Sequence, residues 1–183
     1  MPAHAPAPCI SLNTAAVLTG RSIRTWQRRI EEGLVPRLSD ERGRALVAFE
    51  AVRPALALAL DESEVGLLVR ADQGEAGPQA EVGALFALAA LREAQTAAPA
   101  APGGAVSVMP ALYFLTRSAD QGEADAMHWL GLLHAAGLGD AGGGDAQTLM
   151  WVAKAAAHGH AIAAQQVAAL LPGAGDGKSE QQN

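Results

Sequence analysis

Side chains that can bind nucleic acid gather in one short stretch of the sequence. They are Arg21, Arg24, Gln27, Arg28 and Arg29. These residues flank Ile23, Trp26 and Ile30, which recur at the spacing of one helix face, so most of the polar side chains should point to solvent. A guanidinium can bridge phosphates or fork onto guanine, and a glutamine amide can reach adenine. The pattern predicts a helix that lies in the major groove of double-stranded DNA.

The same stretch has a second interpretation. Glu31 and Glu32 stand at helical spacing from Arg28 and Arg29, with which they could form ion pairs. The stretch would then be a solvated face of a structural or vestigial helix. Both interpretations remain open from the sequence.

Start and stop signals surround this helix. Asn13 or Thr14 is expected to cap a preceding helix that ends at Gly20, and Ser22 is expected to cap the arginine-rich helix itself. The order is therefore helix, tight turn, helix.

A small hairpin is expected after the second helix. Gly33 should end that helix, and Pro36 prevents its continuation. The stretch "LSDERGRALV" at 38–47 then has the Asp and Gly residues of a tight turn. Arg42 and Arg44 in this wing-like hairpin would add phosphate contacts.

A longer motif runs from Leu12 to Pro36. At its centre, "LTGRSIRTWQRRIEEGLVP" contains a glycine turn, a serine, an Arg-Thr pair and a Gly-Leu helix stop. At these spacings it resembles the helix-turn-helix of the MerR and excisionase-like DNA-binding families. The resemblance implies DNA contacts by Arg21, Ser22, Arg24, Thr25, Gln27, Arg28 and Arg29, with Arg42 and Arg44 in the wing. The wing lacks the Arg-aromatic signature of MerR regulators, and nothing resembles their metal-binding or coiled-coil region, so a mercury-type sensor is not expected.

The C-terminal two thirds of the sequence repeats itself. Three stretches share small residues and a glycine: "RADQGEAGPQ" at 70–79, "SADQGEADAM" at 118–127 and "AAAHGHAIAA" at 155–164. Gly74 lies 48 residues before Gly122, which lies 37 residues before Gly159. The 11 additional residues match the Pro-Ala-Gly-rich loop at 95–107.

The stretch between the second and third copies reads as helix, Gly-rich turn, helix. It contains "A-x-x-x-L-G" at 126–131, "G-x-G" at 137–139 and nearly "W-x-x-K-A-A-x-x-G" at 151–159. These motifs resemble Sel-one-like repeats, relatives of the tetratricopeptide repeat. The resemblance implies one well-formed repeat, one looped-out repeat and a final capping helix.

Small and large apolar side chains are expected to have different places in the packing of these helices. Alanines are expected where helices approach closely: Ala124, Ala126, Ala155, Ala156 and Ala161. Larger side chains are expected between the layers: Leu130, Leu133, Leu149, Val152 and Leu170. A continuous helix over residues 47–62, with Pro54 in its first turn, should add a layer and join both parts rigidly.

These elements predict an all-α chain, in which a small winged helix-turn-helix domain packs on a short α-solenoid of antiparallel helix pairs. The expected parts are a disordered segment 1–9, the helix-turn-helix domain 10–53, the repeat domain 54–172 and a disordered tail 173–183. Composition agrees, since 50% of the 183 residues are hydrophobic but only 4% are aromatic. That bias is typical of helices packed through small side chains.

Charge is divided unevenly along the chain, whose formal net charge is −6. Residues 1–53 hold eight Arg against five Asp and Glu, a sum of +3, while residues 54–183 hold five basic against fourteen acidic residues, a sum of −9. The division suggests two tasks, one of which involves a polyanion. The alternative is chance placement of a few charges.

Other residues with potential chemistry are interpreted as structural. Trp26 and Trp151 align with apolar neighbours and should lie in the core. The histidines should be structural or solvated rather than metal ligands, because they have no cysteine and only scattered carboxylates beside them: His128, His134, His158 and His160. Cys9 has no partner and should be inert. Since no nucleophile with a base and no phosphate-binding loop is indicated, neither an enzyme nor a cofactor is expected.

The sequence favours a DNA-binding transcriptional regulator or adaptor, whose acidic repeat surface binds an unidentified protein partner. Because one module with few phosphate contacts should bind weakly, either a homodimer on paired half-sites or recruitment by a partner is expected. The alternative is a protein-protein interaction scaffold that does not bind DNA. No stretch approaches the roughly 18 apolar residues of a membrane helix, so a cytoplasmic location without membrane contact is expected.

Overall fold

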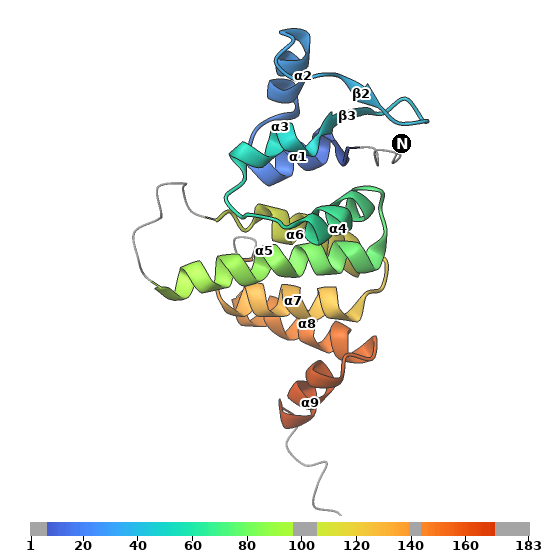
Figure 1. Ribbon diagram of the computed structural model, residues 1–183. Helices are drawn as coiled ribbons and strands as arrows, with labels where there is room; N and C mark the ends of the chain where they lie inside the picture. The colour runs from blue at the N-terminus through green and yellow to red at the C-terminus, as the bar shows by residue number, and fades with distance from the viewer. Residues whose placement is uncertain (1–6, 97–105, 140–143, 171–183) are drawn as a thin grey trace, which may run out of the picture.

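The computed structural model describes residues 7–96, 106–139 and 144–170. They form a mostly helical chain, as predicted, with a small three-stranded antiparallel sheet near the N-terminus, of which the sequence predicted only the hairpin. In Figure 1 the N-terminal elements lie at one end of an elongated molecule, α9 lies at the other, and α4 to α8 are layered between them. The predicted tail and most of the predicted loop at 95–107 lie outside the described residues.

The sheet holds the N-terminal module, residues 7–55, together. Its strands are β1 (Cys9–Ser11), β2 (Leu38–Ser39) and β3 (Ala45–Ala48), in the order β1-β3-β2. Ile10 faces Val47 in the β1–β3 register, and both side chains are fully buried. The pairing of β2 with β3 confirms the predicted hairpin. Cys9 belongs to β1, so ordered structure begins inside the segment expected to be disordered.

Two short helices follow β1 in this module. They are α1 (Leu12–Thr19) and α2 (Ile23–Glu31). Gly20 ends α1 with φ +64°, and the Ser22 side chain caps α2 by accepting the Thr25 N–H, both as predicted. The cap of α1 is Ser11 rather than Asn13 or Thr14, because the extended backbone of β1 runs directly into the helix.

The continuous helix predicted over residues 47–62 is wrong. The chain forms β3 to Ala48, a short helix α3 (Phe49–Val52), a 3-10 turn η1 (Arg53–Ala55) and then a non-helical linker. Leu56, Leu58 and Leu60 are partly or fully buried, whereas the alanines between them are exposed. The linker therefore buries every second side chain, as an extended segment does.

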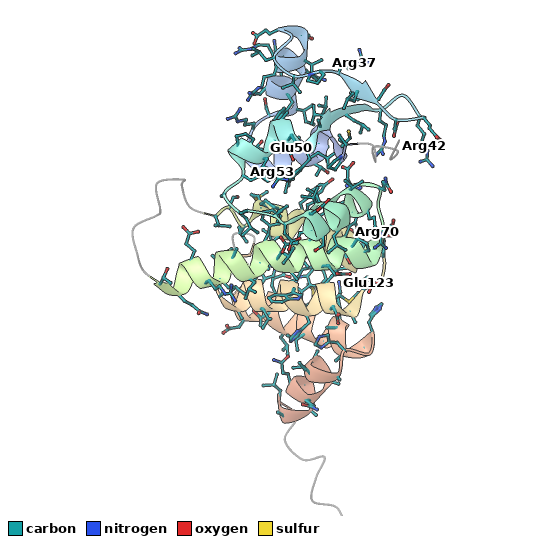
Figure 2. The ribbon with its side chains drawn as sticks, viewed as in Figure 1. Arg37, Arg42, Glu50, Arg53, Arg70 and Glu123 are labelled. Carbon is teal, nitrogen blue, oxygen red and sulfur yellow. The ribbon has the colours of Figure 1, made fainter. Side chains whose placement is uncertain are left out.

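The remaining helices form the helical stack. They are α4 (Glu62–Asp72), α5 (Ala76–Thr96), α6 (Met109–Ala119), α7 (Ala124–Ala135), α8 (Gly144–Ala157) and α9 (Ala161–Leu170). Consecutive helices pack in pairs, most extensively α5 with α6 and α7 with α8. Equivalent glycines with φ of +100°, +98° and +94° form the turns after α4, α6 and α8: Gly74, Gly122 and Gly159. Figure 2 shows Arg70 and Glu123, which flank the first two turns, on the same side of the stack.

Close helix contacts also recur at one position of the repeat. Gly83 and Gly131 each lie nine residues after a turn glycine. A Cβ atom on Gly83 would lie 2.6 Å from Leu115 Cγ, and one on Gly131 would lie 3.0 Å from Val152 Cγ2. Each glycine therefore lets its helix approach the next helix of the pair.

The predicted core of the repeats is only partly correct. Ala126, Ala155, Leu130, Leu133 and Val152 are buried, and Ala124 and Ala156 are half-buried. Leu149 is 50% exposed and Leu170 62% exposed, and Ala161 is also exposed, which corrects the prediction for these three residues. They belong to α8 and α9, which lie at the end of the stack, and in the described residues no further helix layer covers them.

Candidate nucleic-acid interface

Helix α2 stands at the end of the molecule, away from the helical stack (Figure 1). Trp26 is its only buried residue and donates from Nε1 to Thr19 Oγ1 at 3.4 Å. Ile30 is half-buried and packs against the core, whereas Ile23 is 42% exposed, so Trp26 and Ile30 are the members of the predicted apolar stripe that hold α2. The exposed positions of α2 are Ile23, Arg24, Gln27, Arg28 and Glu31.

Some of the predicted contact residues at α2 have no partner within the described residues, and others are hydrogen-bonded in the helix cap. Arg21, Arg24 and Gln27 are exposed, and among the described residues the two arginines form no ion pair. Ser22 and Thr25 are occupied in the helix cap, where their hydroxyl oxygens lie 2.9 Å apart. The exposed groups that remain are suited to phosphate and base edges.

The last two arginines of α2 have partners within the helix. Arg28 Nε lies 3.2 Å from Glu32 Oε1 in an exposed i,i+4 ion pair, as the second interpretation allowed. Arg29 lies over the Trp26 ring, with Cζ 5.4 Å from the ring centroid. Its Nε is buried and has no hydrogen-bond partner in the described part of the chain. Arg29 is therefore packed rather than presented to solvent.

Asp40 organises the turn between β2 and β3. Its Oδ1 accepts the N–H groups of Arg42 and Arg44, and its Oδ2 accepts from Arg44 Nε at 2.6 Å. The hydrogen bond and the charge of Arg44 hold the pKa of Asp40 below its usual value. Arg44 is thus engaged in the turn, whereas Arg42 extends from the tip of the hairpin (Figure 2).

Sequence reasoning missed Arg37 as a member of this surface. Arg37 is exposed and lies between α2 and β2, on the same end of the molecule (Figure 2). The sequence placed it after Pro36, outside both predicted elements. Its position between α2 and Arg42 extends the basic surface from the helix to the hairpin.

Two groups of side-chain hydrogen bonds join this module to the helical stack, and the sequence predicted neither. Asp72 at the end of α4 accepts hydrogen bonds from Ser11 and Thr14 at the start of α1. Asn13 Nδ2 donates to the Tyr113 hydroxyl on α6 at 2.7 Å. The apolar core is also continuous from Ile10 to Ala163.

The histidines connect helices of the stack. The His128 and His160 rings stack with centroids 4.1 Å apart, His128 Nε2 lies 3.1 Å from Gln166 Oε1, and His160 Nδ1 accepts the Ala163 N–H. Burial and the neighbouring His160 lower the pKa of His128. In the described ranges, no group of three or more His, Cys, Asp or Glu side chains could hold a metal ion.

The two tryptophans and the cysteine that were predicted to be structural differ in their burial. Trp26 lies in the core as predicted, whereas Trp151 is half-buried, with Lys154 Nζ 4.6 Å from its ring centroid. Burial raises the pKa of Cys9, which disfavours the thiolate.

Comparison with known proteins identified no relative. No family model matches the chain, and neither a curated protein nor a solved structure matches it. Among the described residues, none of the helices is both long and apolar enough to cross a membrane.

Proposed function

We propose that this chain is a winged helix-turn-helix protein that binds double-stranded DNA through α2 and the β2–β3 hairpin. The observation that carries the proposal is the exposure of α2, in which Trp26 is the one fully buried residue. Arg24 and Gln27 on this helix and Arg21 just before it are exposed. A helix held in this way can enter a major groove while its own core packing stays intact.

The contacts divide by chemistry. Arg24 and Gln27 are suited to base edges, whereas Arg21, Arg37 and Arg42 lie around them and are suited to phosphates. Arg28 would exchange Glu32 for DNA at little cost, because an exposed i,i+4 ion pair contributes only about 0.3–0.5 kcal/mol. Ser22 and Thr25 would act mainly through the cap that starts α2.

We further propose that the helical stack is a short α-solenoid of Sel-one-like type that binds a protein partner. Recurrent turns at Gly74, Gly122 and Gly159 and paired packing support this part of the proposal. The chain would act as a transcriptional regulator or adaptor and not as an enzyme. Few phosphate contacts per module give weak binding, so a homodimer or a recruiting partner would supply the remaining affinity.

A scaffold that does not bind DNA is the second candidate. The Arg28–Glu32 ion pair and the packing of Arg29 on Trp26 favour it, because they satisfy two of the arginines internally. Fluorescence anisotropy with a random duplex over a salt series separates the two functions. The DNA-binding proposal predicts an affinity that falls steadily with salt. Absence of binding at low salt would favour the scaffold.

The partner proposal has its own test. Affinity capture with the full-length chain should recover a protein that binds through the stack. Recovery of no protein, together with a small molecule that copurifies with the chain, would contradict it.

A further inference from the structure

Hydrogen bonding between the N-terminal module and the helical stack is concentrated on Asp72, the last residue of α4. Its Oδ2 accepts the Ser11 N–H at 3.0 Å, and its Oδ1 accepts the Ser11 and Thr14 hydroxyls, each at 2.5 Å. Within the described residues, the other hydrogen bond from module to stack is the exposed one between Asn13 and Tyr113. Asp72 is therefore the main polar anchor of the junction.

The three donors to Asp72 lie at the start of α1. Ser11 is the N-cap of that helix, and Thr14 in its first turn is 1% exposed. The first N–H groups of a helix lack partners within it, and the helix dipole favours a negative charge there. The stack thus supplies the carboxylate that completes the cap of α1.

The duplicated sequence provides an internal comparison for Asp72. "ADQGEA" occurs at 71–76 and again at 119–124, so Asp72 and Asp120 hold the same position before Gly74 and Gly122. The two glycines have nearly the same φ, +100° and +98°. Asp120 is nevertheless exposed, and its side chain makes no hydrogen bond or ion pair in the described part of the chain. The turn itself does not need the carboxylate, so the bonds of Asp72 serve the junction.

The surroundings of Asp72 leave this anchor without dense packing on one side. Asp72 lines an open pocket of about 360 Å³, whose other lining residues are Cys9, Asp40, Glu41, Arg42, Arg44, Leu46 and Gln73. Helix α1 is joined to α2 by the tight turn at Gly20 and by the Trp26–Thr19 hydrogen bond, so the direction of α1 determines that of α2.

We infer that Asp72 is a positioning residue that fixes the direction of α2 relative to the helical stack by holding the start of α1. The inference rests on the proposed function in one respect. If α2 binds DNA and the stack binds a partner, Asp72 sets the direction of the DNA-facing side of α2 relative to that partner. Asp72 itself does not belong to the DNA-facing surface.

Distance measurement between spin labels in the full-length chain tests this role. Labels are placed at the exposed positions Glu31→Cys on α2 and Glu81→Cys on α5, in a Cys9→Ala background. With Asp72 intact, a narrow distance distribution is expected. Asp72→Asn should broaden it, and Asp120→Asn should leave it narrow. If the Asp72→Asn distribution is as narrow as that of the chain with Asp72 intact, the inference is overturned.

A second variant covers the case in which Asp72→Asn does not fold. Thr14→Val removes one hydroxyl donor and keeps the side-chain shape, so it should also broaden the distribution while circular dichroism stays unchanged. A narrow distribution in this variant, with Asp72→Asn unfolded, would reduce Asp72 to a stability role. No DNA is present in this experiment. A chain that responds to Asp72 but binds no duplex would refute the proposed function and keep the positioning role.

Discussion

The N-terminal module and the helical stack hold their helices in different ways. In the module, Trp26 is the one fully buried side chain of α2, and Ile30 packs half-buried against the same core. In the stack, each helix buries several side chains, and glycines allow close approach: Gly83 lies against Leu115, and Gly131 lies against Val152. One fully buried side chain leaves much of the surface of α2 free for polar groups, whereas helices in close contact have much of their surface occupied by each other. The difference explains why a binding surface can form on α2.

The largest effect is expected from removal of Trp26, the one fully buried side chain of α2. Trp26→Ala should cost roughly 3–5 kcal/mol, the range for truncation of a buried large aromatic, and should unfold the module. Urea denaturation measures the change. Trp151→Ala is the matched control, and because Trp151 is only half-buried its removal should cost less. Equal costs for the two tryptophans would contradict the description of Trp26 as the main anchor of α2.

A smaller effect is expected where the stack relies on the absence of a side chain. Gly83→Ala would place a Cβ 2.6 Å from Leu115 Cγ and 3.1 Å from the Leu115 backbone N. Overpacking of this kind should destabilise the chain by about 1–3 kcal/mol. Gly66→Ala on α4 meets no atom within 4 Å and should instead stabilise by up to about 1 kcal/mol through helix propensity. The description of the stack fails if both variants are stabilised to the same extent.

The end of the stack should respond to acid. The pKa of His128 is lower in the folded chain than the ordinary value of about 6.5, so the unfolded chain binds more protons as the pH falls. Stability from this group is therefore fully present above about pH 6.5 and is lost as the pH falls below it. His160, Asp125 and Gln166 are the polar neighbours involved. Urea denaturation at pH 7.5 and 5.5 should show the loss, and His128→Gln should reduce it. An identical pH dependence in the variant would assign the loss to other groups.

The smallest change in stability is expected on the exposed face of α2. Arg24→Ala combined with Arg28→Ala removes two solvent-exposed side chains and one exposed ion pair, which contributes only about 0.3–0.5 kcal/mol. Thermal unfolding should therefore stay close to that of the unaltered chain. A large drop in melting temperature would mean that these arginines support the module rather than face a ligand.

Local signals in the sequence predicted the local structure well. Gly20, Ser22 and the hairpin were predicted correctly because a left-handed turn, a capping hydroxyl and a tight turn each depend on neighbouring residues. The linker is the exception. Leu56, Leu58 and Leu60 alternate with alanines, a period of two that is typical of an extended chain and contradicts the helix predicted there.

Long-range features could not be read in the same way. Asp72 contacts Thr14 across 58 residues, and its copy Asp120 makes no such contact, so the motif alone does not distinguish them. Leu149 and Leu170 look like core residues by type, but their exposure depends on whether another layer follows. Among the candidate DNA contacts, the pairing of Arg44 with Asp40 and the stacking of Arg29 on Trp26 depend on side-chain geometry.

DNA binding by α2 is the central claim, and salt-dependent anisotropy of matched arginine variants tests it most directly. Arg24→Ala with Arg28→Ala is compared with Arg70→Ala with Arg92→Ala, which removes the same charge from exposed positions of the stack. The first pair should weaken duplex binding and flatten the plot of log K against log salt by about one unit for each phosphate that the protein no longer neutralises. The second pair should leave the slope unchanged. If the α2 variant and the stack variant both bind duplex with the affinity and salt slope of the unaltered chain, the arginines of α2 form only a solvated helix face. The scaffold function is then correct.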